Sequence, residues 1–390
     1  MPDAAAPGST TTAASSGMAA VDGHWGSLAA TPPMGWNSWN QVHEAVTEDV
    51  VIAAAEAMVS RGLVDAGYEY VVVDDCWQSA ERTPEGLLLP NPGRFPRGMK
   101  AVADHVHSLG LKFGMYSAPG ERTCAGRLGS SGHEERDASM FAEWGVDFLK
   151  YDWCGAGPLT PESVRPAFER MRDPLVATGR DIVYSVSEYG VARPWEWGRG
   201  TAHLWRTTFD IWPHWGSVFA LLNQQWAACA GSGPGGWADP DMLQVGNGTL
   251  TPEENRSHMA LWALLPAPLF AGNDLAAASD DVVRLLTHPG LIAVNQDPLG
   301  RRARLVAVTP EVMVWARELA GGDLVLGVLN HTEGPVEAAV PLVQAGVVGR
   351  CTAVDVFSGR ELGEPGVGYK AVLERHDTAV LRFNRVPSRP

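Results

Sequence analysis

Two kinds of hydrophobic spacing alternate along most of the chain. Continuous apolar runs such as 68–73 and 111–115 are typical of strands that are buried on both faces. Between the runs, apolar residues recur every three or four positions, as Val51, Ala54 and Met58 do, which predicts amphipathic helices. Strand candidates arise in this way between residues 33 and 274: a segment that begins near 33, then 68–73, 111–115, 148–152, 181–186, 204–208, a segment within 235–242, and 269–274.

Polar and aromatic residues gather where these strands are expected to end. The run 68–73 leads into Asp74 and Asp75, and the run 111–115 leads into Tyr116. A (β/α)8 TIM barrel distributes its active site over the carboxyl ends of many strands. A doubly wound open sheet, the alternative, gathers its ligand groups at one switch point. Because nearly every strand end carries a candidate residue, we predict the barrel.

After about residue 300 the pattern changes to short alternating segments. Val312 and Val314 alternate with other residues, and a Gly-Gly-Asp turn stands at 321–323. This texture predicts a smaller antiparallel domain, a β-sandwich. We therefore expect a catalytic barrel over 25–300 and an antiparallel β domain over 301–390.

The first 24 residues are rich in Ala, Ser, Thr and Gly and lack the basic start and apolar block of a signal peptide. We expect a disordered tail over 1–24. The apolar segment 261–270 is interrupted by Pro266 and Pro268 and is too short to cross a membrane. These features predict a soluble protein, either cytoplasmic or exported with its leader removed.

Charge and composition narrow the choice of ligand. The formal net charge of −15 disfavours nucleic acid and anionic membranes as partners and favours an uncharged or cationic ligand. The 15 tryptophans suit stacking on sugar rings, although tryptophan also fills large cores. Five cysteines cannot all pair with one another, so the chain is not a disulfide scaffold. His105 and His107 are two positions apart on a predicted helix and cannot share a face, so we expect no metal site.

The strand at 148–152 ends in groups that are unusual in a core. Alternate side chains of a strand share a face, so Lys150, Asp152 and Cys154 are expected to project together. A nearby cation favours the ionised form of a carboxyl group, which is the form in which Asp can act as a nucleophile. A structural ion pair at the end of a strand is the alternative interpretation of the same residues.

Six ordered segments make the pattern more specific: TPPMGWNSWN, YVVVDDCW, GMYSAPG, FLKYDWC, WRTTFD and GPGGWADPDML. In order and spacing they resemble glycoside hydrolase family 27, a family of retaining α-galactosidases that also includes α-N-acetylgalactosaminidases and β-L-arabinopyranosidases. The resemblance covers the predicted barrel, and a β-sandwich after the barrel also fits the family. It implies an exo-glycosidase that releases terminal α-linked galactose from an oligosaccharide or glycoconjugate. It implies no cofactor, and it leaves the oligomeric state open.

The resemblance assigns the two catalytic carboxyl groups. It implies that Asp152 attacks the anomeric carbon and that Asp210 is the general acid/base. Retaining hydrolysis needs one carboxyl group that is ionised and one that is protonated at the start. We expect Lys150 to keep Asp152 ionised, and we expect the apolar neighbours Phe209 and Trp212 to raise the pKa of Asp210.

Other positions match the galactose contacts of the family. Asp74 and Asp75 match a pair that accepts hydrogen bonds from O4 and O6, and Lys150 is expected near O3 or O4. The remaining matches are Trp36 as an apolar floor, Tyr116 as a pocket wall, Arg206 and Asp241 near O2 and the acid/base, and Ser187, Glu188 and Tyr189 as the segment that discriminates the C2 substituent.

The cysteines agree with the family only in part. Cys124 and Cys154 match a disulfide pair at the rim of the family's active site. Cys76 lies where relatives form a second bridge, but the partner region 39–43 has no cysteine here, so Cys76 is expected to be a free buried thiol. The Cys-Glu-Trp that is common in relatives is replaced here by residues 187–189, which changes the C2 side of the pocket.

Several alternatives remain open at this stage. A β-L-arabinopyranosidase would bind the same ring without the C6 group, but two short Asp side chains at 74 and 75 leave room for O6 and favour galactose. Glu188 and Tyr189 argue against an α-N-acetylgalactosaminidase. A non-catalytic sugar-binding barrel is disfavoured because both carboxyl groups are present. A barrel isomerase rests on the fold alone, without a phosphate-binding glycine loop.

Overall fold

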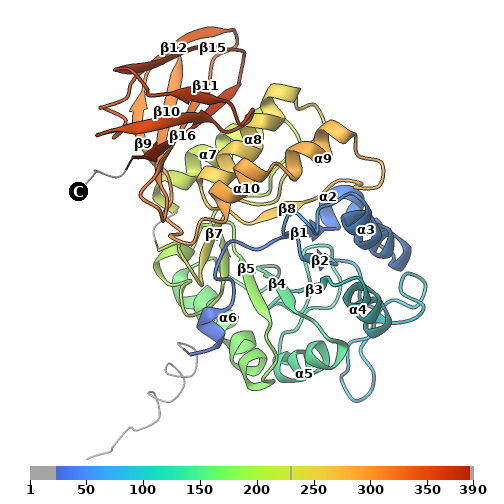
Figure 1. Cartoon of the computed structure of the whole chain (residues 1–390). Coiled ribbons are helices and arrows are strands. Elements are labelled where there is room, and N and C mark those ends of the chain that lie inside the picture. The colour runs from blue at the N-terminus through green and yellow to red at the C-terminus, as the bar shows by residue number, and fades with distance from the viewer. Residues whose placement is uncertain (1–22, 229–230, 387–390) are drawn as a thin grey trace, which may run out of the picture.

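The computed structural model describes residues 23–228 and 231–386, which form a barrel of parallel strands and a β-sandwich beside it (Figure 1). The barrel sheet has the order β7-β6-β5-β4-β3-β2-β1-β8. Leu243, just after β7, bridges to Ala271 of β8, and this contact completes the ring. The barrel strands are β1 Met34–Asn37, β2 Tyr70–Val72, β3 Lys112–Ser117, β4 Phe148–Asp152, β5 Val183–Ser187, β6 Leu204–Arg206, β7 Trp237–Asp239 and β8 Leu269–Ala271.

These strands confirm the predicted barrel, although several are shorter than the sequence pattern suggests. The strands expected at 204–208 and 269–274 end at Arg206 and Ala271. Beyond those ends, each chain turns into the loops at the carboxyl face. The predicted site residues are therefore divided: Tyr116 and Asp152 lie at the ends of their strands, whereas Asp74 and Asp210 lie on loops.

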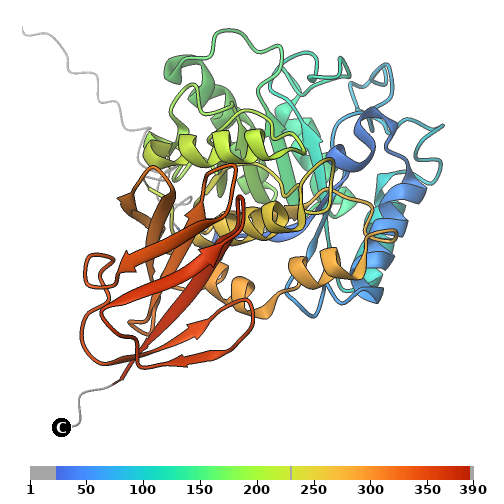
Figure 2. The same cartoon turned by 90° about the horizontal axis from the view of Figure 1, so that it is seen from above.

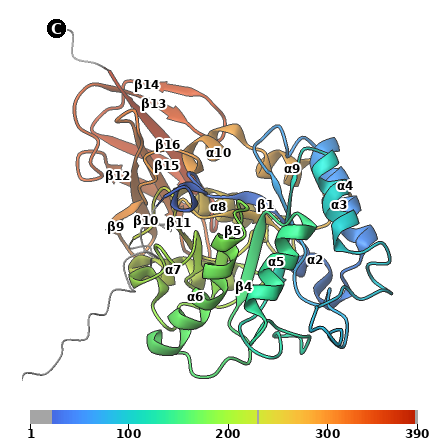
Figure 3. The ribbon, with the colours of Figure 1, turned by 90° about the horizontal axis from the view of Figure 1, so that it is seen from below.

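Helices surround the barrel, with α3 to α6 outside β2 to β5 (Figures 1 and 3). Side-chain caps begin two of them: Thr47 accepts a hydrogen bond from the backbone N–H of Val50, and Thr251 and Glu254 form a capping box. Helix α6 continues through Pro166 and Pro174. The helical segments are η1 Trp25–Ser27, α2 Trp39–Val42, η2 His43–Ala45, α3 Glu48–Ser60, α4 Met99–Ser108, α5 Glu134–Trp144, α6 Pro161–Ala177, η3 Pro194–Glu196, α7 Trp215–Ala228, α8 Pro252–Leu264, α9 Asp280–Leu286 and α10 Pro289–Asn295.

The C-terminal part is antiparallel, as predicted. A larger sheet with the order β14-β13-β16-β11-β10-β9 faces a two-stranded sheet, β12-β15. Apolar side chains from both sheets form their own core cluster, which includes Val314, Leu326 and Leu381. The strands are β9 Arg304–Val308, β10 Val312–Glu318, β11 Leu324–Asn330, β12 Val336–Pro341, β13 Cys351–Asp355, β14 Glu361–Gly363, β15 Gly368–Leu373 and β16 Thr378–Arg385.

Helix α8 lies between the barrel and the sandwich (Figures 1 and 2, gold). Its residues 257–264 are all buried, because it packs against the barrel on one side and against β11 and β16 on the other. The main hydrophobic core cluster accordingly includes residues of both parts, such as Leu261 of α8 and Leu329 of β11. One continuous core therefore joins the two domains.

The ends of the chain bear on two earlier expectations. Most of the tail expected over 1–24 lies outside the described residues, and His24 forms a contact of 2.7 Å with Asp181. Among the described residues, no helix has the length and apolar character that crossing a membrane requires.

Candidate active site

A cavity of about 440 Å³ opens at the carboxyl ends of the barrel strands, a volume typical of a small-molecule site. Its walls come from the segments that follow most of the strands, so residues distant in the sequence meet there. Among the predicted site residues, those that line it are Asp74, Asp75, Tyr116, Cys124, Lys150, Asp152, Tyr189, Arg206, Asp210 and Asp241. Trp36, Ser187, Glu188 and Cys154 are not among its lining residues.

Asp152, the last residue of β4, lies deep in this cavity and is 8% exposed. The hydroxyl group of Tyr116 donates a hydrogen bond to its Oδ2 over 3.2 Å. Burial raises the pKa of Asp152, and the positive charges of Lys150 and Arg206 oppose this rise without cancelling it. The expectation that Lys150 favours the ionised form thus holds in direction, but desolvation is the larger effect.

Lys150 forms its ion pair with a different carboxylate. Its Nζ lies 2.8 Å from Oδ2 of Asp74. Burial favours the neutral amine, but Asp74 and Asp152 together raise the pKa of Lys150 well above its usual value. The group therefore remains a cation, and it lies between the nucleophile candidate and Asp74.

The adjacent carboxyl groups of Asp74 and Asp75 are held apart by different partners. Asp74 Oδ2 accepts hydrogen bonds from Asn37 Nδ2 over 2.7 Å and from Lys150 Nζ over 2.8 Å. Asp75 Oδ2 accepts from the backbone N–H of Ala125 over 2.9 Å. Burial raises the pKa of Asp75, and the neighbouring Asp74 adds to the rise. The pair thus offers fixed carboxylate oxygens to a polyhydroxyl ligand.

Asp210 lies at the mouth of the cavity rather than in an apolar enclosure. Its side chain is 63% exposed, and Phe209 and Trp212 beside it are largely exposed as well. Its Oδ1 is 2.8 Å from Nη2 of Arg206. The structure therefore differs from the sequence-based expectation, which surrounded this carboxyl group with apolar side chains.

Arg206 joins two carboxylates at this rim. The same Nη2 lies 2.6 Å from Oδ2 of Asp241, and that oxygen also accepts the backbone N–H of Ile211 over 2.7 Å. Although burial opposes it, the nearby carboxylates raise the pKa of Arg206 above its usual value, with Asp241 contributing most. Arg206 is thus a fixed cation between Asp210 and Asp241.

The three residues after β5 take different positions. Tyr189, with a positive φ of 64°, lines the cavity, and its ring stacks on that of Phe209 at a centroid distance of 5.9 Å. Ser187 borders a small internal cavity of about 30 Å³ beneath the site. Glu188 is fully buried and accepts the backbone N–H of Ala192 over 2.6 Å. Glu188 was expected to face the sugar, but it is buried and its Oε2 bonds within its own loop.

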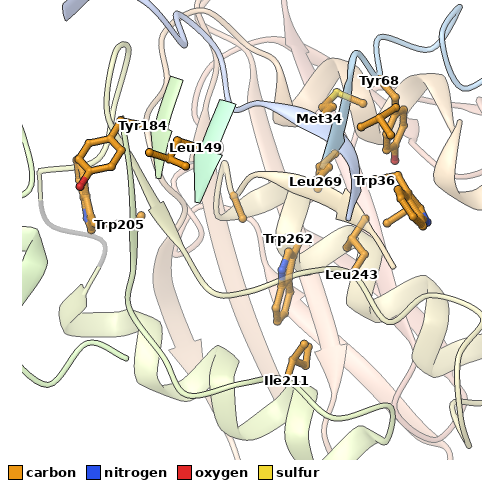
Figure 4. Packing of buried hydrophobic residues seen from close by; sticks show 14 of the residues in the cluster. Met34, Trp36, Tyr68, Leu149, Tyr184, Trp205, Ile211, Leu243, Trp262 and Leu269 are labelled. Atoms are coloured by element: carbon orange, nitrogen blue, oxygen red, sulfur yellow. The ribbon is translucent and has the colours of Figure 1, made fainter. Parts of the chain in front are cut away.

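Trp36 also differs from its expected place. Along β1, a Cβ added to Gly35 would meet Phe270, which belongs to a cluster with Phe148 inside the barrel. The next residue, Trp36, therefore points outward: it is fully buried in the main core, and its Nε1 donates to the carbonyl oxygen of Asn273 over 3.0 Å (Figure 4). Trp39, three residues on, lines the cavity instead.

The predicted disulfide bond between Cys124 and Cys154 is present, with Cα atoms 5.0 Å apart. It joins the loop after β3 to the loop after β4, beside Asp152. Cys76 is a free buried cysteine, as expected. In the described part of the chain, Cys124, Asp152 and Cys154 are the residues whose potential metal-binding atoms lie close together. The two sulfur atoms of this group are bonded to each other in the disulfide, so they are not free thiolate ligands.

Several lining residues were not among the predicted site residues. They lie in the segments that follow β1, β6 and β7, and they are Trp39, Asn40, His43, Ile211, Trp212, Pro213, Met242, Gln244, Asn247 and Gly248. Trp39 and Asn40 stand inside a segment used for the resemblance, so that segment held a signal for them. Residues 244–248 lie in the loop between β7 and α8, beyond the last of the segments used for the resemblance, and carried no such signal.

Comparisons with known proteins agree with the fold and identify the family. A family profile described as alpha galactosidase A matches residues 31–297, and one described as the alpha galactosidase C-terminal beta sandwich domain matches residues 309–383. The chain is 43% identical to alpha-galactosidase A of Cellvibrio japonicus over 321 residues, which is 80% of this chain and 78% of the relative.

Solved structures show the same architecture. Alpha-galactosidase I of Mortierella vinacea matches with a TM-score of 0.89 at 33% identity, over 91% of this chain and 97% of that one. The family 27 β-L-arabinopyranosidase of Geobacillus stearothermophilus, in complex with arabinose, matches with a TM-score of 0.86 at 27% identity, over 93% and 99%. Both likenesses span the barrel and the sandwich.

Proposed function

The chain belongs to glycoside hydrolase family 27 as an α-galactosidase, and on this premise we propose that Asp152 is its nucleophile and Asp210 its general acid/base. The observation that carries the proposal is the unequal placement of the two carboxyl groups. Asp152 is deep in the cavity, whereas Asp210 is exposed at the mouth. A terminal sugar that fills the deep end leaves the rest of the substrate at the mouth, next to Asp210.

In the first step, a carboxylate oxygen of Asp152 attacks the anomeric carbon from the face opposite the leaving group. The bond from that carbon to the glycosidic oxygen breaks, and Asp210 gives its proton to the departing oxygen. The product is a β-linked galactosyl-enzyme ester and a free alcohol. Tyr116, which donates to Asp152 in the free enzyme, holds the attacking carboxylate in place.

In the second step, Asp210 takes a proton from a water molecule, which attacks the anomeric carbon on the face that the alcohol left. The ester bond to Asp152 breaks, and α-galactose is released with its original configuration. The exposure of Asp210 suits this step, since the water arrives from the open mouth. Arg206 Nη2, 2.8 Å from Oδ1 of Asp210, orients this carboxyl group at the mouth through both steps.

Galactose is the proposed terminal sugar, and a galactose-containing oligosaccharide or glycoconjugate is the proposed substrate. In this proposal Asp74 and Asp75, which line the cavity, accept hydrogen bonds from O4 and O6, and Lys150 donates to O3 or O4. A panel of p-nitrophenyl α-galactoside, β-L-arabinopyranoside and α-N-acetylgalactosaminide tests this choice. Turnover of the arabinopyranoside that exceeds that of the galactoside would contradict it.

Discrimination at C2 is proposed to rest on Tyr189 alone. It lines the cavity beside Asp152 and Asp210, whereas Glu188 is fully buried in its loop. The Tyr189 ring is also fixed by its stack on Phe209. A bulky N-acetyl group would meet this ring, which favours a plain hydroxyl group at C2.

The roles of the two carboxyl groups are tested by replacing each with alanine. Asp152→Ala should lose activity on every galactoside by a factor of at least about 10⁴, because no other group can form the glycosyl-enzyme bond. Asp210→Ala should lose about 10²- to 10⁴-fold on substrates with sugar leaving groups. It should lose much less of the first-step rate on 2,4-dinitrophenyl α-galactoside, whose leaving group needs no proton.

Azide distinguishes the assignments further. Added azide should restore turnover of Asp210→Ala, because the anion attacks the galactosyl-enzyme without a general base. Attack on a β-linked intermediate gives α-galactosyl azide, which NMR identifies. Recovery of β-galactosyl azide from Asp210→Ala would show that the roles are assigned incorrectly.

A further inference from the structure

The loop that fixes Asp210 is anchored to a buried helix beneath it. Asp241 holds the backbone N–H of Ile211 through its carboxylate, and Gln244 Nε2 donates to the carbonyl oxygen of Ile211 over 3.2 Å. Ile211 follows Asp210 directly, so both polar groups of its backbone are tied to the segment 241–244. Arg206 completes the link, because it contacts Asp241 and Asp210 through one nitrogen.

The segment 241–244 is in turn held by two side chains of α8. Trp262 Nε1 donates a hydrogen bond to the carbonyl oxygen of Asp241 over 2.8 Å, and His258 Nε2 accepts the backbone N–H of Gln244 over 2.9 Å. His258 and Trp262 are one helical turn apart, and their rings touch edge to face at 4.2 Å. Burial lowers the pKa of His258 to about 3, so the ring stays neutral and can accept.

Asp241 needs such support because its backbone is unfavourable. Its φ is 85°, in a region that residues with a Cβ seldom occupy. The contacts to its carbonyl oxygen, its carboxylate and its N–H, which donates to Asp239 Oδ1 over 2.9 Å, hold it there together. Figure 4 shows Trp262 between Ile211 and Leu243, which belong to the two loop segments concerned.

The other side of α8 is fixed by the β-sandwich. Ser257 Oγ donates to the carbonyl oxygen of His376 over 2.5 Å and accepts from Thr378 Oγ1 over 2.7 Å. Glu254 pairs with His376 Nδ1 over 2.7 Å. The fully buried Arg317 of β10 donates to the carbonyl oxygen of Ala263, near the end of α8. Each of these contacts lies away from the cavity.

We propose that Trp262 and His258 are positioning residues for the acid/base Asp210, and that the β-sandwich takes part in catalysis by fixing the helix that carries them. The proposal rests on the role given to Asp210 above. It predicts that distant changes in α8 or the sandwich weaken proton donation while galactose binding at the deep end stays the same. Among the described residues, the side-chain hydrogen bonds of Asp152 and Tyr116 go to one another and to the two rim cysteines, not to α8.

The test is Trp262→Phe, which removes the indole N–H and keeps an aromatic ring. kcat/KM for a galactosyl disaccharide should fall about three- to tenfold, the effect of losing one hydrogen bond. kcat/KM for 2,4-dinitrophenyl α-galactoside and the inhibition constant of galactose should change less than about twofold, since neither depends on a proton from Asp210. The dependence of rate on leaving-group pKa should therefore become steeper.

Trp237→Phe is the matched control. Trp237 is also fully buried and also donates its indole N–H to a backbone carbonyl, that of Ala29, over 2.7 Å. Trp237→Phe should alter neither the ratio of kcat/KM for the two substrates nor the dependence of rate on leaving-group pKa. If Trp262→Phe lowered the rates on both substrates equally, or if Trp237→Phe gave the same steeper slope, the effect would be one of general stability and the proposal would be overturned.

A change in the sandwich tests the second half of the proposal. Thr378→Val keeps the shape of the side chain and removes its hydrogen bond to Ser257. Thr378→Val should lower kcat/KM for the disaccharide about twofold and leave kcat/KM for 2,4-dinitrophenyl α-galactoside unchanged. An unchanged ratio of the two values would show that the sandwich has no part in positioning Asp210.

Asp210→Ala separates this inference from the proposed function. If that variant shows no dependence on the leaving group, the role of Asp210 fails. If it shows the dependence and Trp262→Phe does not, only the inference fails.

Discussion

Charged side chains at the carboxyl end of the barrel form ion pairs, and the types of these residues alone do not predict which partner each one takes. Lys150 lies near two carboxylates and forms its ion pair with Asp74, while burial raises the pKa of Asp152. Arg206 bridges Asp210 and Asp241. At this scale, desolvation competes with the attraction of a nearby cation, and the outcome depends on distances of a few ångströms.

Glu188 gives a prediction about stability and pH. Burial raises the pKa of Glu188 from an ordinary 4.5 to about 8. The folded protein therefore binds a proton that the unfolded chain releases between these two values, so this group's contribution to stability is lost as pH rises from about 4.5 to 8. In Glu188→Gln this loss is absent. The free energy of unfolding of the variant relative to the parent should rise by roughly 1.4 kcal/mol per pH unit in that window.

Urea unfolding of both proteins at several pH values measures this difference. Glu196→Gln, which changes an exposed glutamate in the same loop, is the control and should show no such trend. A difference between Glu188→Gln and the parent that is constant with pH would mean that Glu188 is ionised in the folded protein at neutral pH.

At the scale of elements, loops rather than strands complete the site. The disulfide bond between Cys124 and Cys154 joins two of these loops, and Ala125, next to Cys124, donates to Asp75. The stack of Tyr189 on Phe209 joins the loop after β5 to the loop after β6. Neighbouring loops thus brace one another around the cavity, and the barrel strands set only where each loop begins.

Removing the disulfide bond should weaken both the fold and sugar binding. The bond spans 30 residues, and closing a loop of that length stabilises the folded state by about 3 to 4 kcal/mol. The double variant Cys124→Ser, Cys154→Ser should therefore melt about 4 °C lower for a chain of this size. Its KM for a galactoside should rise several-fold, because the loop that holds Asp75 is released.

Calorimetry and steady-state kinetics, with and without dithiothreitol, measure these effects. Dithiothreitol should reproduce them in the parent protein and leave the double variant unchanged. Cys351→Ala, which alters a free thiol in the sandwich, should keep the sensitivity of the parent to dithiothreitol. An unaltered melting temperature in the double variant would exclude a stabilising role for the bond.

At the scale of the whole molecule, the barrel and the sandwich share one hydrophobic core. Leu329 and Val380 of the sandwich belong to the same cluster as Leu261 and Trp262 of α8. The buried Arg317 crosses this boundary, and burial lowers its pKa to about 10, which leaves it charged at neutral pH. An interface of this kind resembles the interior of one domain more than a contact between two.

We therefore expect the two parts to unfold together. Scanning calorimetry should show one transition, with a calorimetric enthalpy close to the van't Hoff enthalpy. Leu329→Ala, in the sandwich, should cost about 2 to 5 kcal/mol, and activity should be lost at the same lowered temperature as the β-sheet signal. Two separate transitions, or a barrel that stays active after the sandwich melts, would contradict this expectation.

The sequence determined the features that depend on local patterns. Continuous apolar runs located barrel strands, and six motifs identified the family. The same motifs contain the candidates Asp152 and Asp210, and the wider resemblance pointed to the disulfide pair, because chemistry at strand ends needs particular residue types at particular spacings. These signals can be read from the sequence because each involves residues that are close together along the chain.

Only the tertiary structure decided which way side chains point and which partners they choose. Trp36 points out of the barrel into the surrounding core because its strand neighbour Gly35 faces the barrel interior, and Glu188 turns into its own loop while Tyr189, at positive φ, faces the cavity. The support of Asp210 by α8 joins residues about 50 positions apart. Such contacts depend on how loops and domains pack. The segments that contribute to this packing are far apart in the sequence, so no local pattern predicts which of them will meet.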